Sequence, residues 1–276
     1  MFLEEMFLAL SYRAAIGIEH GPVPVIAVVI PMTNLRAIIF DFDGTLVTGT
    51  NAGYIRCYHA AAESVGYQLP FVVTQGRVLE RWGTAPRIEL ASVLRETPEL
   101  VDQAVCVYEG LLETPLFSEE VMPVPGVNRI LEELRSAKIL PVVISGMPKR
   151  LLKKFSKSYN FNFRDDELVS TIATDEPAKQ KATGFHLRSM MNDNKWTSEE
   201  IFVVGDAKSD IQMADTQGVR TIAVLTGFLT ESDAKALGAF TVANSVADLA
   251  NIFREYGYNK AMDAASDRVI VCRGVD

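Results

Sequence analysis

The sequence predicts an α/β fold, in which a parallel, Rossmann-like sheet core carries an inserted α-helical cap. Three observations support this fold class. Short apolar runs of strand length alternate with helical patterns, and such alternation builds parallel sheets through crossover connections. One stretch of about 70 residues, directly after the first strand, contains helical patterns alone. The chain of 276 residues, with 48% apolar and 22% charged residues, has a globular composition and room for both parts.

Six apolar runs are predicted as strands of this sheet. The first reads LRAIIF and stops at Asp41. A short apolar run with β-branched residues is typical of a parallel strand that is buried on both faces. The predicted strands are residues 35–40, 140–145, 168–173, 201–205, 220–224 and 240–242.

Helical patterns fill the intervals between these runs. Residues 54–66 are predicted as a helix that Gly66 ends, and residues 72–121 continue as helices interrupted by glycine and proline. The aromatic and methionine side chains of this stretch are expected to pack in its own core. Further helices are predicted at residues 127–134, 151–158 and 208–218.

These patterns divide the chain into a core, a cap and two terminal segments. We expect the α/β core at residues 33–50 and 122–254, with the helical cap at 51–121 between its two parts. Residues 1–32 are interpreted as an N-terminal extension, because Met32 directly precedes the first strand. Residues 255–276 are interpreted as a C-terminal tail.

The charge balance argues against a nucleic-acid partner. The formal net charge is −8, from 27 basic and 35 acidic residues, and a negative field repels phosphate backbones. A net negative charge also favours a soluble monomer or small homo-oligomer. No apolar run reaches the roughly 18 residues that a membrane helix needs, so we expect no membrane partner.

Two further features favour the cytoplasm. Glu4 and Glu5 stand where a secretory signal would carry lysine or arginine. Cys57, Cys106 and Cys272 are far apart, cannot all pair with one another and form no CxxC motif. A reduced, cytoplasmic compartment is the simplest interpretation.

Acidic and small polar residues follow three of the predicted strands. They are Asp41, Asp43 and Gly44 after the first, Ser145 and Gly146 after the second, and Asp206 and Asp210 after the fourth. Ligands of open α/β sheets bind at the carboxyl ends of the strands. Side chains alternate along an extended segment, so Asp41 and Asp43 should face the same side. Gly44 should let the chain turn and bring a backbone N–H close to a ligand.

Converging carboxylates repel one another, so they take up protons or share a cation. Oxygen ligands without nearby histidine or cysteine suit Mg²⁺; His20, His59 and His186 show no ligand spacing. Beside such an ion, one aspartate can attack phosphorus and a second can protonate the leaving oxygen. The strand ends can therefore support the transfer of a phosphoryl group to an aspartate.

Three segments of the chain resemble motifs of one enzyme superfamily. DFDGT at residues 41–45, VVISG at 142–146 and VVGDAKSD at 203–210 are similar to motifs I, II and IV of the haloacid dehalogenase-like hydrolases. Residues 125–146 resemble the segment that precedes motif II in the phosphatase-type members. The resemblance spans about residues 33–254 and includes an insert with the size and place of the α-helical C1 cap.

The resemblance implies a role for each matched residue. Asp41 would be the nucleophile and a Mg²⁺ ligand. Asp43 would be the general acid and base, with its backbone carbonyl on Mg²⁺. Gly44 would contribute to substrate binding, while Ser145 and the Gly146 N–H would hold the phosphoryl oxygens. Asp206 would ligate Mg²⁺, and Asp210 would support that metal site.

The family also uses a lysine in its motif III to neutralise phosphoryl charge. Lys179 and Lys181 are both candidates, and the usual Gly-Lys-Pro context is missing around them. Lys181 lies 25 residues before Asp206, which resembles the family spacing. We therefore favour Lys181 and keep Lys179 as the alternative.

Several functions remain compatible with the sequence. The leading hypothesis is a phosphoglycolate phosphatase-like, Mg²⁺-dependent phosphomonoesterase that hydrolyses a small-molecule phosphate ester, a phosphorylated metabolite, through an aspartyl-phosphate. The alternatives are a sugar-phosphate mutase of the same superfamily and a non-catalytic binding scaffold. Asp43 argues against the dehalogenase branch, and the absence of lysine from residues 51–121 argues against the phosphonatase branch. A response-regulator receiver domain would lack the helical insert. The arginines of the insert are expected to be mainly surface residues.

Overall fold

A six-stranded parallel sheet forms the centre of the fold in this computed structural model, which describes residues 35–172 and 176–255. The strand order is β5-β4-β1-β6-β7-β8. The predicted α/β fold class is therefore confirmed. The expectations for residues 1–32 and for 256–276 fall outside the described residues. The strands are β1 (Ala37–Phe40), β4 (Leu140–Ser145), β5 (Leu168–Ser170), β6 (Ile201–Gly205), β7 (Arg220–Val224) and β8 (Thr241–Ala243).

The central strand β1 is buried on both faces, and its side chains alternate between two hydrophobic cores. Ala37 and Ile39 belong to one core, whereas Ile38 and Phe40 belong to the other. This alternation follows from the two-residue repeat of an extended chain. The continuous apolar sequence of the strand is thus explained by helices on both sides of the sheet.

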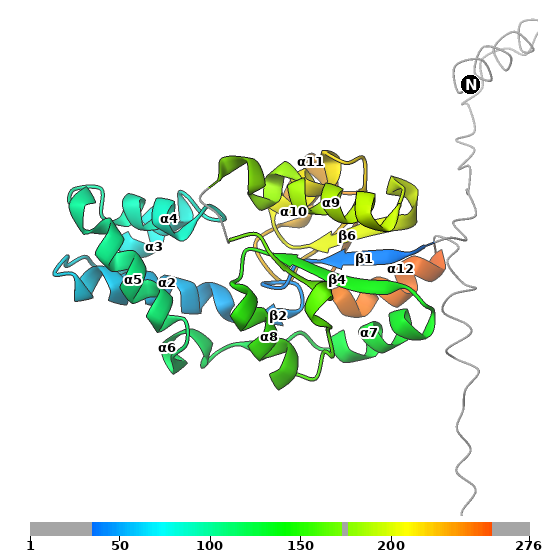
Figure 1. The fold of residues 1–276 in the computed structure, drawn as a ribbon, viewed down its shortest axis with the longest axis horizontal. Helices are drawn as coiled ribbons and strands as arrows, with labels where there is room; N and C mark the ends of the chain where they lie inside the picture. The colour runs from blue at the N-terminus through cyan, green and yellow to red at the C-terminus, as the bar shows by residue number, and fades with distance from the viewer. Residues whose placement is uncertain (1–34, 173–175, 256–276) are drawn as a thin grey trace, which may run out of the picture. The chain divides into compact units, whose positions relative to one another are not determined.

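Helices cover both faces of the sheet (Figure 1). On one face, Leu187 of α9 and Met213 of α10 pack against Ile39 and its neighbours. On the other, the apolar sides of α7, α8 and α12 pack against Phe40 and its neighbours. The helices of this part are α7 (Val127–Ser136), α8 (Lys149–Ser158), α9 (Phe185–Asn194), α10 (Lys208–Asp215), α11 (Glu231–Ala236) and α12 (Leu249–Glu255).

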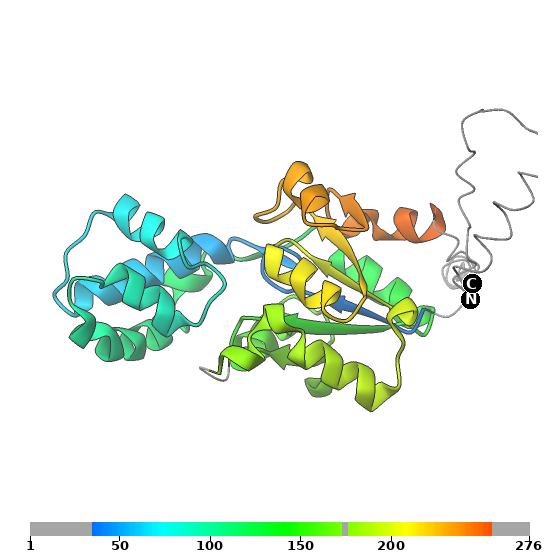
Figure 2. The same ribbon diagram turned by 90° about the horizontal axis from the view of Figure 1, so that it is seen from above.

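The helical insert leaves and re-enters the sheet region through a pair of short antiparallel strands. In this pair, Val47 of β2 (Val47–Thr48) lies opposite Pro123 of β3 (Met122–Pro123). Residues 49–121 are all described and contain helices and turns without a strand. The five helices gather beside one end of the sheet (Figure 2). They are α2 (Thr50–Ser64), α3 (Phe71–Leu79), α4 (Pro86–Val93), α5 (Val101–Leu111) and α6 (Pro115–Ser118).

The structure differs from the predicted elements in a few places. Helix α9 was not expected, because among its residues only Leu187 is buried and it shows little apolar stripe. Strand β5 ends at Ser170, so the predicted strand at 168–173 is shorter than expected. Strand β8 is shifted by one residue from the predicted 240–242. None of the helices within the described residues is long and apolar enough to cross a membrane.

Candidate active site

The carboxyl ends of three adjacent strands bring the predicted site residues to one edge of the sheet. Phe40 of β1 pairs with Val143 of β4 on one side and with Val204 of β6 on the other. The chain leaves β1 at Asp41, and the Asp41 N–H continues the ladder by donating to the Val204 carbonyl at 2.9 Å. Residues that follow these strands are therefore neighbours in space.

The segment after β1 places two aspartates on the open side of the sheet. Phe42 is fully buried, and its ring packs against Phe155 and Phe161. Asp41 and Asp43, on either side of Phe42, both line a cavity. This arrangement is what the alternation of an extended chain requires.

Gly44 turns the chain after these aspartates, with φ at +70°. Its N–H donates to the Val47 carbonyl at 2.8 Å, and it is not among the residues that line the cavity. The structure therefore does not support the expectation that this N–H reaches a ligand. A Cβ at position 44 would overlap the Asp206 carboxylate. Gly44 is thus needed for the turn and for room beside Asp206.

Lys181 lies between two of the aspartates. Its Nζ is 2.7 Å from Asp41 Oδ1 and 2.6 Å from Asp210 Oδ1, and its side chain is buried. Burial alone would lower the pKa of this ammonium, but the charges of Asp210 and Asp41 outweigh burial and raise the pKa above its usual value. Lys179, the alternative candidate, pairs instead with Glu176 at 2.8 Å.

The carboxylates of Asp206 and Asp210 accept hydrogen bonds from backbone N–H groups and from one hydroxyl. Asp206 accepts from Thr45 Oγ1 and from the Phe228 N–H, both at 3.2 Å. Asp210 Oδ2 accepts from the Ala207 N–H at 3.0 Å, at the start of α10. Burial, followed by the charge of Asp41, raises the pKa of Asp206 well above its usual value. Burial also raises the pKa of Asp210 to about 6.

The acidic cluster has the donor set of a hard divalent cation. Asp41, Asp206 and Asp210 each offer one carboxylate oxygen, and these three atoms lie within 4.8 Å of one another. The Asp43 side chain is not part of this group. A Cβ on Gly227 would overlap the Asp206 side chain, as one on Gly44 would, so two glycines leave a cradle for that carboxylate. Oxygen ligands of this kind suit Mg²⁺.

Asp43 and Ser145 lie next to each other in the wall of the cavity. Ser145 Oγ lies 3.4 Å from Asp43 Oδ2 and accepts a hydrogen bond from the Met147 N–H at 3.2 Å. Asp43 Oδ1 is buried without a hydrogen-bond partner. Burial, reinforced by the nearby Asp41 charge, raises the pKa of Asp43 to about 7. Gly146 also lines the cavity, with open space where a Cβ would stand.

The cavity above these residues has a volume of about 550 Å³ and is lined on its far side by residues of the helical insert. Tyr54, Trp82, Glu89 and Tyr108 line this far wall, and Phe228 approaches it from the loop after β7. The sequence predicts packing alone for the aromatic residues of the insert, and Glu89 is not among the predicted site residues. The signal was weak, because these side chains come from separate helices and loops.

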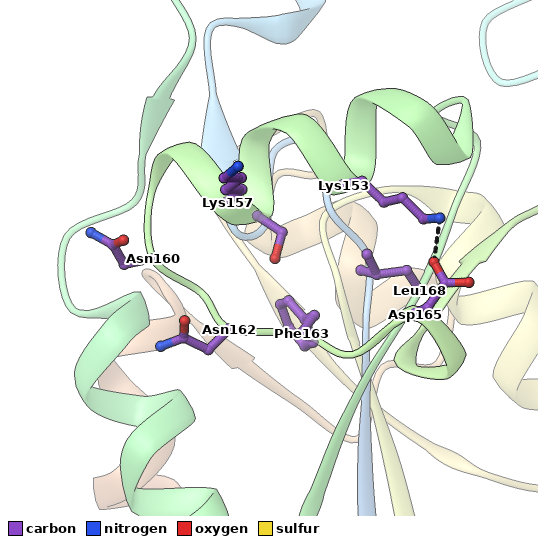
Figure 3. Close-up of a pocket in the computed structure, with 8 residues that line it drawn as sticks. Lys153, Lys157, Asn160, Asn162, Phe163, Asp165 and Leu168 are labelled. Atoms are coloured by element: carbon purple, nitrogen blue, oxygen red, sulfur yellow. Dashed lines mark ion pairs between the residues drawn. The ribbon is translucent and has the colours of Figure 1, made fainter.

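A second hollow, of about 410 Å³, lies along α8 and the loop that follows it (Figure 3). It shares no lining residue with the larger cavity. Its one acid, Asp165, pairs with Lys153 at 2.5 Å and with Lys149 at 3.4 Å. The candidate active site is therefore the larger cavity, where the aspartates converge.

Two curated relatives named phosphoglycolate phosphatase are similar to most of the chain. The protein from Vibrio cholerae serotype O1 is 23% identical over 206 residues, which cover 71% of this chain and 87% of the relative. The protein from Synechococcus elongatus is 26% identical over 196 residues, which cover 70% of this chain and 85% of the relative.

A solved structure from Haemophilus somnus, described as a predicted phosphoglycolate phosphatase, has a similar fold. Its TM-score is 0.66 at 18% identity, and the match covers 80% of this chain and 99% of that chain. At this identity the likeness concerns the fold alone. The family model described as "Haloacid dehalogenase-like hydrolase" matches residues 38–224, from β1 to the end of β7. The chain therefore belongs to the haloacid dehalogenase-like hydrolase family and is a hydrolase.

Proposed function

We propose that this protein is a Mg²⁺-dependent phosphomonoesterase that hydrolyses a small phosphate ester through an aspartyl-phosphate on Asp41. The observation that carries this proposal is the position of Asp41. It stands at the carboxyl end of the central strand, faces the cavity, and lies 2.7 Å from Lys181 Nζ. Two curated relatives bear the name phosphoglycolate phosphatase, so 2-phosphoglycolate is a first compound to test.

In the first step, an oxygen of Asp41 forms a bond to phosphorus while the ester P–O bond breaks. The leaving alkoxide takes a proton from the Asp43 carboxyl, which also lines the cavity. In the second step, Asp43 accepts a proton from water, and the resulting hydroxide attacks phosphorus. The aspartyl bond breaks, inorganic phosphate is released, and the Asp41 carboxylate returns.

Other residues of the cavity bind the phosphoryl group and the ion. Lys181, Ser145 and the Gly146 N–H would hold phosphoryl oxygens, and Asp41, Asp206, Asp210 and the Asp43 carbonyl would form or support the Mg²⁺ site. When bound, Mg²⁺ supplies positive charge that stabilises the charge of the transferring phosphoryl group. The described thiols, Cys57 and Cys106, are unbonded, which suits the proposed reduced, cytoplasmic setting.

The proposal is tested by phosphate release from p-nitrophenyl phosphate. We expect turnover with Mg²⁺, loss of turnover with EDTA, and recovery when excess Mg²⁺ is added, because three carboxylates without a cation repel both one another and the substrate. If the folded protein releases no phosphate from any monoester, it is instead the binding scaffold. If hexose phosphates are isomerised with little phosphate release, it is instead a mutase.

Lys181→Ala should reduce kcat/KM for p-nitrophenyl phosphate by about 10²–10³-fold, the usual effect of removing one electrostatic group that stabilises the transition state. The buried ammonium contacts the nucleophile Asp41 directly. Lys179→Ala is the matched control. It should stay within about threefold of wild type, because Lys179 pairs with Glu176 outside the acidic cluster. The reverse order of effects would transfer the role to Lys179.

A further inference from the structure

The wall of the cavity that faces the aspartates is aromatic. The Tyr58 and Tyr108 rings stack with centroids 4.2 Å apart, and Trp82 lies between Tyr54 and Phe228 with centroid distances of 6.1 and 5.0 Å. All five rings line the cavity. Aromatic faces carry partial negative charge and attract cations. This wall therefore favours an apolar or cationic group, and none of its lining side chains from the insert carries a positive charge.

One carboxyl group is set into this wall. Glu89 of α4 lines the cavity although its residue exposure is only 5%. Its Oε1 accepts from the Gly83 N–H at 3.0 Å, and its Oε2 accepts from the Tyr58 hydroxyl. Among the described residues no ion pair joins Glu89 to a lysine or arginine. Burial raises the pKa of Glu89 to about 7, as expected for a buried acid with hydrogen bonds but without a cation.

Three arginines of the insert are engaged away from the cavity. Arg56 pairs with Glu120 at 3.0 Å, Arg77 pairs with Glu96 at 2.7 Å, and Arg87 pairs with Asp102. No arginine, lysine or histidine of the insert lines the cavity. The two lysines that line the cavity lie outside the insert, in the part of the chain that forms the sheet and its covering helices. Lys181 is held by Asp41 and Asp210, and Lys208 is exposed on α10.

We propose that Glu89 and the surrounding aromatic wall select phosphate monoesters whose alcohol part carries a hydrogen-bond donor, a hydroxyl or an ammonium, and no negative charge. This inference rests on the proposed phosphatase function and names its substrate class. A donor on the substrate would find a carboxyl acceptor already fixed by Gly83 and Tyr58. A second carboxylate would lose its hydration beside Glu89 without gaining a cation from the insert. On this proposal, 2-phosphoglycolate, whose alcohol part carries a carboxylate, should be a poorer substrate than an ester whose alcohol part carries a hydroxyl.

Matched alkyl phosphates test this selection. Chains of two to six carbons, each ending in an amino, hydroxyl, methyl or carboxyl group, present one change at a time. The series also varies the distance between the phosphate and the group that would meet Glu89. At the best chain length, wild-type kcat/KM should be at least about tenfold higher for the amino or hydroxyl ester than for the carboxyl ester, equivalent to about 1.4 kcal/mol. Comparing kcat/KM for the amino esters with kcat/KM for the hydroxyl esters shows whether the preferred group is an ammonium or an alcohol.

Substitution of Glu89 should change the ratio between substrates. In Glu89→Gln, which keeps the shape of the side chain, the amino-to-carboxyl ratio should fall by about tenfold or more, because the desolvated charge pair is lost. The ratio is measured within one variant, so a general loss of activity does not affect it. Glu80→Gln removes an exposed acid that does not line the cavity, and it should keep the wild-type ratio.

Three results overturn the inference, and they separate a wrong substrate class from a wrong function. If wild type hydrolyses p-nitrophenyl phosphate but prefers the carboxyl ester, or if Glu89→Gln keeps the wild-type ratio, the substrate class is wrong and the phosphatase function stands. If wild type hydrolyses no phosphate ester with Mg²⁺, the proposed function itself fails, and the inference fails with it. Glu89→Arg is a second variant. It should shift the ratio further toward the carboxyl ester.

Discussion

Asp41→Asn should abolish phosphatase activity, with kcat for p-nitrophenyl phosphate reduced on the order of 10⁴-fold or more, as when a nucleophile is removed from an enzyme. An amide oxygen does not attack phosphorus, so the covalent step has no substitute in the cavity. The substitution also removes one of the three carboxylates that lie within 4.8 Å of one another. The substitution therefore removes the proposed nucleophile and weakens the proposed metal site together.

The fold should survive this change, because Asp41 contributes to the site more than to the core. Its backbone N–H still donates to Val204, and Lys181 keeps Asp210 at 2.6 Å. Thermal unfolding of Asp41→Asn should accordingly remain a single transition. Asp215→Asn, an exposed substitution at the end of α10, is the matched control and should keep wild-type turnover. A folded Asp41→Asn protein that retains a tenth of wild-type kcat would rule out Asp41 as the nucleophile.

The sequence allowed the sheet and the edge that carries the acids to be predicted, because both depend on local signals. Each central strand is a short apolar run, and each run stops at a polar residue such as Asp41 or Asp206. Strand direction then places those residues at one edge without any knowledge of packing. The approach of Lys181 to Asp41 could be expected only from spacing and resemblance, because residues 173–181 carry no strong periodic pattern.

The far wall of the cavity could not be predicted, because no local signal in the sequence marks its residues. Tyr58, Glu89 and Tyr108 come from three helices of the insert, and nothing local distinguishes a residue that faces a cavity from one that faces a core. Tyr58 and Tyr108 do both, because they are buried among core residues and also line the cavity. The hydrogen bond from the Phe228 N–H to Asp206 could not be predicted either. Every residue type except proline has a backbone N–H, so the sequence does not indicate which loop N–H will bind a carboxylate.

Asp43→Ala should reveal a different defect from Asp41→Asn, because the nucleophile remains. Loss of the proton donor should slow the hydrolysis of an alkyl phosphate by about 10²–10⁴-fold, the usual contribution of general acid–base catalysis. p-Nitrophenyl phosphate has a leaving group that needs little protonation, so its first step should slow much less. The water that cleaves the aspartyl-phosphate also lacks its base, and phosphoenzyme should therefore accumulate on Asp41.

The surroundings of Asp43 support its proposed role as acid and base. Its carboxyl lines the cavity beside Asp41, with Oδ2 3.4 Å from Ser145 Oγ and with Oδ1 buried and without a hydrogen-bond partner. Asp43→Asn is the matched variant, since an amide preserves the shape and neither gives nor takes the proton; it should behave as Asp43→Ala does. The measurements are single-turnover rates with both substrates and mass spectrometry of quenched enzyme. If both substrates slow equally and no phosphoenzyme appears at any time, Asp43 is a structural or metal-site residue, because a lost acid–base group must affect the poorer leaving group more.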